Sequence, residues 1–154
     1  MFRNAIAGHW VTDFNKTVFS HHLDTHKRRF NISRVPATAE ELTAWANDVG
    51  YDMVFAGPLE SMLEDTDVVI AISSSGNSPN IIKAVEVAKN HNVPVIGLSG
   101  FDGGKLNQLA DVKIFVPAPN GEYELVESTH DTIMHLMTRY FRDYFDHLVD
   151  RGVR

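Results

Sequence analysis

The sequence predicts an α/β fold in which a mostly parallel sheet is flanked by helices. From residue 67 onward, short apolar runs alternate with stretches that have helical periodicity. The apolar runs lack the polar alternation of a sheet with one face in water, so their strands are expected to be covered on both faces. The chain has 154 residues, with no internal repeat and no linker rich in proline, glycine or serine. A single domain over residues 1–154 is therefore expected.

A helix is predicted at the start of the chain, over residues 3 to 18. Ile6, Trp10 and Phe14 have the spacing of side chains on one side of a helix. The polar stretch that follows, "SHHLDTHKRR", contains three histidines. A solvated loop explains this stretch better than a metal site does.

Two elements are predicted between this loop and residue 50. The run "FNISRV", residues 30–35, is expected to form a short strand that ends at Pro36. A helix is then expected to begin at Thr38, because Glu41 three residues later completes a capping box. This helix should stop at Gly50.

The remainder of the chain alternates strands and helices. Residues 51–63 look helical, with an interruption or kink at Pro58. Ser78 and Pro79 are typical of an N-cap and a first helical position, so they mark the start of a helix. The strands are expected at 67–73, 93–99 and 111–116, and the helices at 78–91, briefly near 106–110, and over one long stretch at 123–148.

Composition excludes several classes of protein. Lysine and arginine total 14 against 20 acidic residues, a net charge of −6 with no long basic block, which argues against nucleic acid as a direct ligand. There are no cysteines, so any metal would need histidine and carboxylate ligands. No apolar run approaches the roughly 20 residues of a membrane span, and the start lacks a secretory signal. A soluble cytoplasmic protein is the expectation.

The stretch "ISSSGNSPN" follows the first buried strand and precedes a helix. In an open parallel sheet, ligands bind beyond the carboxyl ends of the strands, where a helix N-terminus favours an anion. Gly76 lets the backbone approach an anion closely, and the hydroxyls of Ser73, Ser75 and Ser78 can donate hydrogen bonds to it. We call residues 73–78 the serine loop and predict that it binds a phosphate ester. The alternative is an ordinary strand-to-helix turn, which explains Ser78 but not the other hydroxyls.

Histidines and carboxylates form a second candidate site. His9 and Asp13 are four residues apart and share one helix face. Glu127, His130 and His135 lie in the last predicted helix. A His–carboxylate pair meeting a Glu and a His would suit a metal or acid–base chemistry. From spacing alone, ordinary surface and core histidines are the better interpretation.

The run "DVVIAISSSGNSPNIIKAVEVAKNHNVPVIGLSGFDGGKLNQLADVKIFVP" is accompanied by "HWVTDFNK", "LTAWANDVGYDMVFA" and "VESTHDTIMH" elsewhere in the chain. In these stretches the sequence resembles the sugar isomerase (SIS) domain, and within it the phosphoheptose isomerase branch. The resemblance covers nearly the whole chain. It implies a three-layer, flavodoxin-like sandwich with a mostly parallel sheet between helices.

The resemblance also implies a reaction and its setting. It implies aldose–ketose isomerisation of sedoheptulose 7-phosphate to glycero-manno-heptose 7-phosphate. This activity would supply heptose for a bacterial lipopolysaccharide or capsule. The implied assembly is a homotetramer or homodimer with sites between subunits. A non-catalytic sugar-phosphate-binding or protein-interaction module on the same fold is the alternative.

The resemblance assigns roles to named residues. Family members carry a His and a Glu on an early helix and a Gln and a His on the last helix, and in some members these four hold zinc. The matching positions here are His9, Asp13, Glu127 and His135. Asp13 is implied as the base and His135 as its acid–base partner. The implied phosphate and sugar contacts are Ser73, Ser74, Ser75, Ser78, Asn47, Asp48 and Glu127.

Three departures from the family pattern bear on activity. Asp13 stands where Glu is usual, which shortens the carboxylate arm by one methylene. Glu127 stands where Gln is usual and adds negative charge. Both changes favour a divalent metal. Family members also begin with a further helix, a strand and an Asn-Gly-Gly-Ser loop, which this sequence is expected to lack.

Overall fold

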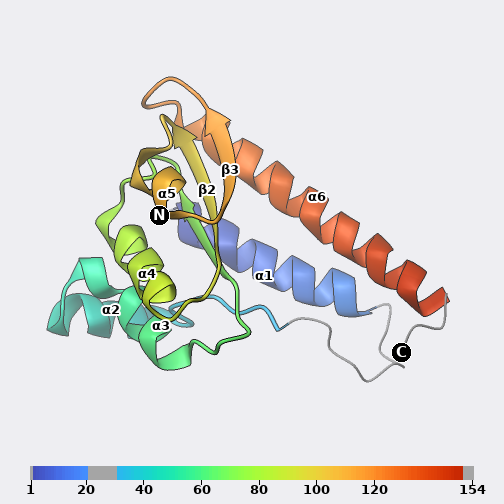
Figure 1. Cartoon of the computed structure of the whole chain (residues 1–154), viewed down its shortest axis with the longest axis horizontal. Coiled ribbons are helices and arrows are strands. Elements are labelled where there is room, and N and C mark those ends of the chain that lie inside the picture. Colours follow the sequence, from blue (N-terminus) through green and yellow to red (C-terminus); the bar gives the residue numbers. More distant parts are fainter. Residues whose placement is uncertain (1, 21–30, 151–154) are drawn as a thin grey trace. The chain divides into compact units, whose positions relative to one another are not determined.

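The computed structural model describes residues 2–20 and 31–150 (Figure 1). The chain divides into two compact units, and each is described by itself. The sheet unit comprises residues 35–128. The α1–α6 unit comprises the described residues before Val35 and those from Thr129 onward. Most of the histidine-rich stretch predicted as a loop, residues 21–30, lies outside the described residues.

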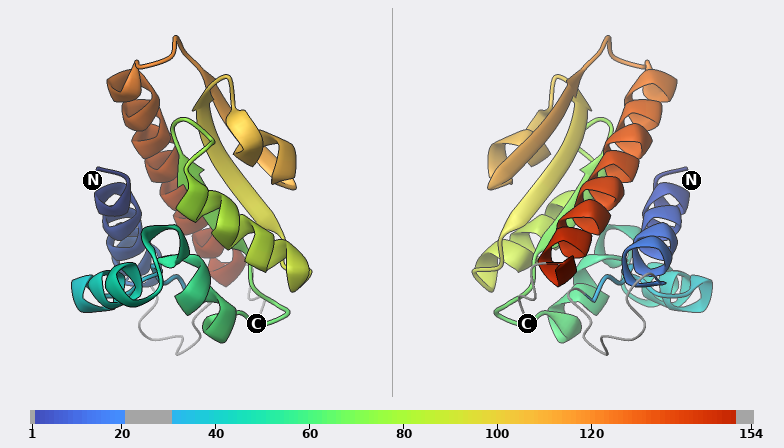
Figure 2. Two further views of the ribbon diagram at one scale, coloured as in Figure 1. Left: turned by 90° about the vertical axis from the view of Figure 1, so that its left-hand side faces the viewer. Right: turned by 90° about the vertical axis from the view of Figure 1, so that its right-hand side faces the viewer.

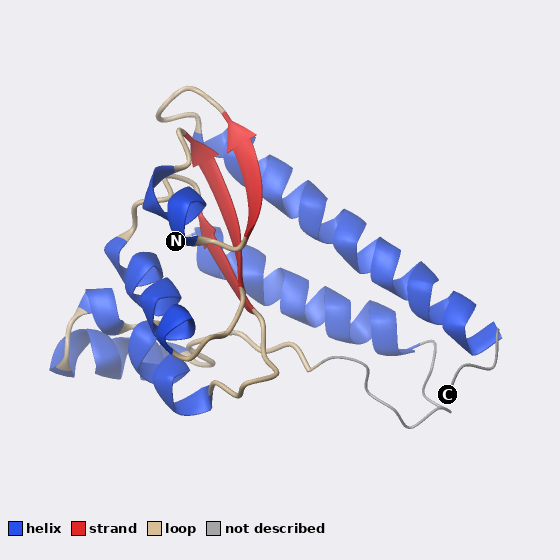
Figure 3. Ribbon diagram, viewed as in Figure 1, coloured by secondary structure: helices blue, strands red, loops and turns tan. Residues whose placement is uncertain are grey.

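The sheet unit is built on three parallel strands. They are β1 (Val69–Ser73), β2 (Val95–Phe101) and β3 (Val112–Pro117), hydrogen-bonded in the order β1-β2-β3. The register pairs Ala71 with Gly97 and Ser73 with Ser99. Figure 3 shows the three arrows pointing the same way. The carboxyl ends of the strands therefore meet at one edge of the sheet, as the sequence predicts.

Helices pack on both faces of this sheet. On one face, α4 (Pro79–Asn90) and α5 (Gly104–Leu109) enclose a core that includes Val85, Val95 and Leu106 (Figure 2). Gly97 is essential to this packing, because a Cβ there would lie 2.7 Å from the Cβ of Ala110. On the other face, Gly100 lies against Val126 in the first turn of α6. The predicted α/β fold with a helix-flanked parallel sheet is confirmed.

Three short helical elements precede β1. The N-cap predicted at Thr38 for α2 (Ala39–Asp48) is confirmed, because Glu41 N–H donates to Thr38 Oγ1 at 3.1 Å. The reciprocal bond of the capping box is shifted by one residue, since Glu41 Oε2 accepts from Ala37 N–H at 2.7 Å. A 3-10 turn η2 (Tyr51–Met53) and helix α3 (Ala56–Met62) follow. The prediction of an interruption at Pro58 is wrong. The break falls before α3, and Pro58 lies in its first turn, where a missing N–H costs no helical hydrogen bond.

The strand predicted at residues 30–35 is also wrong for the described part, 31–35. These residues join no strand of the described chain. The Ile32 carbonyl accepts a hydrogen bond from the Asn15 side-chain amide at 3.0 Å instead of pairing with a strand. An apolar run of this length predicts a strand only if a neighbouring strand is available, which the sequence pattern does not reveal.

The α1–α6 unit consists mainly of two long helices. Helix α1 (Phe2–Ser20) lies beside α6 (Tyr123–Asp150), as Figure 1 shows in blue and orange-red. Phe14 packs edge-on against Phe141, with ring centroids 5.7 Å apart. The buried indole N–H of Trp10 donates to Thr138 Oγ1 at 3.0 Å. The two helices are thus joined by an aromatic core and one buried hydrogen bond.

None of the helices in residues 2–20 and 31–150 is both long enough and apolar enough to cross a membrane. This agrees with the absence of a long apolar run in the sequence.

Acid should weaken the sheet unit through Asp111. The Lys89 ammonium, and then the N–H of Val95, hydrogen-bond this carboxylate and hold its pKa below the usual range. A depressed folded pKa stabilises the fold above the unfolded value, near pH 4, and that stability is lost as the pH falls toward the folded pKa. Urea denaturation of the wild type and Asp111→Asn between pH 2 and 6 should show a smaller acid loss in the variant. Equal pH slopes would contradict this.

Candidate functional site

The serine loop lies at the carboxyl edge of the sheet. It connects the end of β1 to the N-terminus of α4, so the free N–H groups of a twelve-residue helix face the same end as the loop. Gly76 has a φ of +64°, a left-handed conformation that glycine adopts without strain. The loop is attached to β2, because Gly100 N–H donates to the Ser74 carbonyl at 2.9 Å.

The four serines of this loop differ in exposure and partners. Ser73 and Ser74 are fully buried, whereas Ser75 and Ser78 are partly exposed. Ser74 Oγ donates to Glu127 Oε1 at 3.4 Å, and the Ser73 and Ser78 hydroxyls lie 3.1 Å apart.

Ser78 occupies the N-cap position but makes no side-chain capping hydrogen bond. Its hydroxyl lies against that of Ser73 instead.

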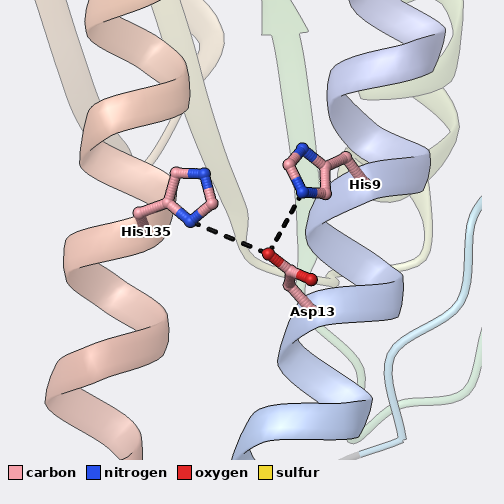
Figure 4. A group of neighbouring side chains, drawn as sticks. All are labelled: His9, Asp13 and His135. Carbon is pink, nitrogen blue, oxygen red and sulfur yellow. Dashed lines mark ion pairs between the residues drawn. The ribbon is translucent and has the colours of Figure 1, made fainter.

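The α1–α6 unit carries the second cluster, formed by His9, Asp13 and His135 (Figure 4). Asp13 Oδ2 lies 3.1 Å from His9 Nε2 and 3.8 Å from His135 Nδ1. The two imidazole rings meet edge to face, with centroids 5.3 Å apart. His9 and Asp13 come from successive turns of α1, and His135 reaches them from α6. One carboxylate oxygen therefore stands between two imidazoles.

Solvent and neighbouring charges shape this cluster. The side chains of His9 and His135 are 55% and 50% exposed, whereas Asp13 is 23% exposed. Lys16 Nζ lies 3.5 Å from the other oxygen of Asp13, and Asp131 Oδ2 lies 3.6 Å from His135 Nε2. The carboxylate is thus partly sheltered and flanked by cationic or proton-carrying groups. Both imidazoles are open to a ligand from solvent.

The three side chains suit a divalent metal. Their donor atoms all lie within 4.8 Å of one another. Ligands at about 2.0–2.2 Å from a tetrahedral zinc lie about 3.3 Å apart, close to the spacing between Asp13 and the two imidazoles. Histidine nitrogen and carboxylate oxygen are ligands that zinc accepts. The same groups can also accept and donate protons, so the cluster fits metal binding and acid–base chemistry.

Comparison with known families identifies the chain. A family model described as the SIS domain matches residues 37–141, which include the serine loop and His135. The chain belongs to the SIS domain family. The match begins after His9 and Asp13, so the family model covers one side of the second cluster only.

Known relatives of this SIS chain are named phosphoheptose isomerases. The Helicobacter hepaticus protein is 41% identical over 62% of the chain and 48% of its own length. The Cytophaga hutchinsonii protein is 41% identical over 73% of the chain and 61% of its own length. The chain thus spans about half to three fifths of these relatives.

A solved structure has the same fold. The Neisseria gonorrhoeae phosphoheptose isomerase superposes with a TM-score of 0.77 and 29% identity, over 90% of this chain and 70% of that one.

The sequence-predicted residues of the SIS chain fall into three groups. The structure brings His9, Asp13 and His135 together. Glu127 belongs to the sheet unit, where it contacts Ser74. The third group, Asn47 and Asp48, is exposed in the last turn of α2, and no hydrogen bond recorded for residues 31–150 joins either side chain to the serine loop.

His130, which the sequence places on the same predicted helix as Glu127 and His135, lies in the interior of the SIS chain. It is fully buried, in contrast to the half-exposed His135. A buried histidine at this position is a core residue of α6. The structure places His135, and not His130, beside Asp13.

Sequence reasoning missed a second loop of the SIS chain that touches the serine loop. It comprises the turn after β2 and the start of α5, where Gly103 and Gly104 both have positive φ. Leu106 N–H at its end donates to the Gly76 carbonyl at 2.9 Å. By composition, "GFDGGK", residues 100–105, indicates only a polar turn. The paired glycines after the second strand are the signal that could have revealed the contact, because they permit close approach of two backbones.

Proposed function

We propose that the chain is a phosphoheptose isomerase that interconverts sedoheptulose 7-phosphate and glycero-manno-heptose 7-phosphate. The observation that carries this proposal is the serine loop, which presents hydroxyls at the N-terminus of α4 at the carboxyl edge of a parallel sheet. Relatives that carry the name phosphoheptose isomerase support the choice of substrate.

The serine loop is proposed to hold the phosphate of the sugar. Ser75 and Ser78 are partly exposed and can donate to phosphate oxygens directly. Ser73 and Ser74 are buried and form the floor of the loop. The dipole of α4 adds attraction for the dianion. We expect Ser75 and Ser78 to dominate affinity, with Ser73 and Ser74 setting the shape of the loop.

The His9–Asp13–His135 cluster is proposed to move the protons. Aldose–ketose isomerisation removes a proton from the carbon next to the carbonyl, forms an enediol, and returns a proton to the neighbouring carbon. Asp13 would take the carbon-bound proton as the base. His135 would shuttle the proton between the two sugar oxygens. His9, 3.1 Å from Asp13, would orient the carboxylate. Asn47, Asp48 and Glu127 are proposed sugar contacts.

Zinc is the proposed metal of this cluster, held by His9, Asp13 and His135, with Glu127 as a further proposed ligand. Bound zinc would polarise the sugar carbonyl and hydroxyl oxygens. The donor types and the spacing of the first three side chains support this choice.

The histidines of the cluster should decide zinc affinity. We expect His9→Ala to weaken zinc binding at least about tenfold in calorimetric titration. Even the loss of a residue that only hydrogen-bonds to a metal ligand typically lowers metal affinity by about that factor. The matched control is His91→Ala, because His91 pairs with Glu60 in the sheet unit and lies outside the cluster. Equal zinc affinity in wild type and His9→Ala would refute the metal assignment.

The decisive test of function is direct observation of the reaction. The purified chain is mixed with sedoheptulose 7-phosphate, with and without zinc, and followed by NMR. Appearance of the aldose signals supports the isomerase. Absence of product under both conditions refutes it for the chain as given.

A sugar-phosphate-binding module without turnover is the second candidate. The serine loop and its contacts lie entirely within the sheet unit, so phosphate binding does not require the cluster on α1 and α6. Asp13 and Glu127, which depart from the residues usual in the resembled family, also favour this reading. Binding of sedoheptulose 7-phosphate by calorimetry with no product by NMR would support the module. Turnover would eliminate it.

The proposal extends to the cellular location of the protein and to its oligomeric state. We place the activity in the cytoplasm, in the supply of heptose for a lipopolysaccharide or capsule. We also propose a homodimer or homotetramer with sites between subunits. Leu136, Tyr140 and Tyr144 support assembly, because they recur every four residues on α6 and are 46–63% exposed. A monomer by light scattering would contradict the assembly.

A further inference from the structure

The serine loop is interlocked with residues 100–106, which comprise the last two residues of β2, a two-residue turn and the start of α5, and which we call the loop after β2. Gly100 N–H donates to the Ser74 carbonyl, and Leu106 N–H donates to the Gly76 carbonyl, both at 2.9 Å. A Cβ on Gly76 would lie 2.0 Å from the Gly103 carbonyl oxygen, so the two backbones are in direct contact. The shape of the serine loop therefore depends on the loop after β2.

Asn77 is the side chain that joins the two loops. Its Oδ1 accepts a hydrogen bond from the Lys105 N–H at 3.0 Å. Its Nδ2 donates to the Ser75 carbonyl at 3.1 Å. Gly104 makes room for this side chain, since a Cβ there would lie 2.6 Å from Asn77 Nδ2. One amide group thus holds both loops at once.

Asn77 also determines how the Ser75 hydroxyl can act. The Asn77 backbone N–H donates to Ser75 Oγ at 3.2 Å. A serine hydroxyl has one proton to donate and two lone pairs. Because a lone pair of Ser75 is already occupied by Asn77, its proton is directed away from Asn77 and is available to a ligand. Donation is the role that an anionic phosphate requires.

We propose that Asn77 is a positioning residue for phosphate. By accepting the hydrogen bond from Lys105 N–H, Asn77 holds Ser75 and the Gly76 backbone in the conformation that binds the anion. This inference rests on the proposed function only in that the serine loop is the phosphate site. Asn77 acts through Ser75 and need not touch the ligand. Its loss should weaken phosphate binding and raise KM for a sugar phosphate, with kcat little changed.

The test is a double-mutant cycle on the hydrogen bond between Asn77 and Lys105. Asn77→Ala removes the acceptor. Lys105→Pro removes the N–H donor in the first turn of α5, where the helix itself does not use it. Lys105→Ala is the reference for the proline variant, because it loses the same side chain but keeps the N–H. Inorganic phosphate is the ligand, titrated by NMR.

We expect about fivefold weaker phosphate binding in Asn77→Ala than in wild type, the usual effect of one net hydrogen bond. Lys105→Pro should be weaker than Lys105→Ala by a similar factor. In the Asn77→Ala background the difference between proline and alanine at residue 105 should vanish, because the bond is already lost. Asn77→Asp keeps the acceptor and should preserve the hydrogen-exchange protection of the Lys105 amide, which Asn77→Ala should abolish.

A general loss of folding cannot mimic this pattern. Asn90→Ala, at the opposite end of α4, is the control for replacing an exposed asparagine in the same unit. Unchanged phosphate affinity in Asn77→Ala, or a proline effect of equal size in both backgrounds, would overturn the inference. Absence of phosphate binding to wild type would also overturn it. If wild type binds phosphate but does not isomerise the sugar, the isomerase proposal is refuted. The double-mutant cycle on Asn77 and Lys105 still tests the role of Asn77 in that case.

Discussion

Asp13→Asn is expected to lower the rate of heptose phosphate isomerisation by about 10²–10⁴-fold, the usual contribution of a positioned proton-transfer group. The amide keeps the size of the side chain but cannot accept a proton from carbon. Affinity for sedoheptulose 7-phosphate should stay near that of wild type, because the serine loop is unaltered. NMR of the reaction gives the rate, and calorimetry gives the affinity. Both are measured with and without zinc.

Asp143→Asn is the matched control for this change. Asp143 is a carboxylate on α6 whose two oxygens share the Arg139 Nε–H, at 3.0 and 2.8 Å, and it lies outside the cluster. A substitution at a surface position such as Asp143 usually changes the free energy of unfolding by less than about 0.5 kcal/mol. The isomerisation rate of Asp143→Asn should therefore stay within about twofold of wild type. If Asp13→Asn retains the wild-type rate, Asp13 is not the base, and the proton must be taken by another group.

Gly76→Ala should lower the free energy of unfolding by about 2–5 kcal/mol and abolish phosphate binding. A residue with a Cβ costs about 1–2 kcal/mol at the positive φ of Gly76. Overpacking against the Gly103 carbonyl, which is backbone and cannot rotate away, adds about 1–3 kcal/mol. Urea denaturation measures the stability, and NMR titration with inorganic phosphate measures binding.

Gly121→Ala separates these two costs. Gly121 also has a positive φ, +100°, but a Cβ there meets no atom within 4 Å beyond its chain neighbours. Only the backbone cost should remain, about 1–2 kcal/mol, and phosphate binding should persist. Equal destabilisation by the two variants would mean that the contact between Gly76 and Gly103 contributes nothing to stability.

Local signals in the sequence predicted the elements of the sheet unit well. The N-cap bond between Thr38 and Glu41 forms because both partners lie within one turn of helix. The apolar runs after residue 67 became β1, β2 and β3, but the burial they predicted on both faces holds best for β2 and fails for β3, in which no residue is buried and Val112 and Phe115 are exposed. The strand expected at 30–35 failed because pairing depends on a neighbour elsewhere in the chain. The interruption expected at Pro58 failed because proline breaks a helix in its interior, whereas Pro58 lies in the first turn of α3.

The candidate site was predictable only in part. The spacing of His9 and Asp13 placed them on one helix face, and the structure confirms their contact. Bringing His135 to the same carboxylate required the family resemblance, because spacing within a helix says nothing about which residue of another helix it meets. The contact of Asn77 with Lys105 was not foreseen. It depends on the register between β1 and β2 and on glycine conformations that no periodicity encodes.

The strand order β1-β2-β3 has a consequence for how the protein is made. Among the strands of the described residues, β2 pairs with β1 and β3 pairs with β2, so each new strand finds a partner that has just been synthesised. The backbone hydrogen bonds that shape the serine loop, from Ser73 to Leu106, need only β1, β2 and the start of α5, whereas the contact of Ser74 with Glu127 also needs α6. On the ribosome, where chains fold from the N-terminus onward, the backbone of this loop can therefore take its shape while β3 and α6 are still being translated. A phosphorylated sugar in the cell could engage the nascent chain at that stage and oppose its reopening.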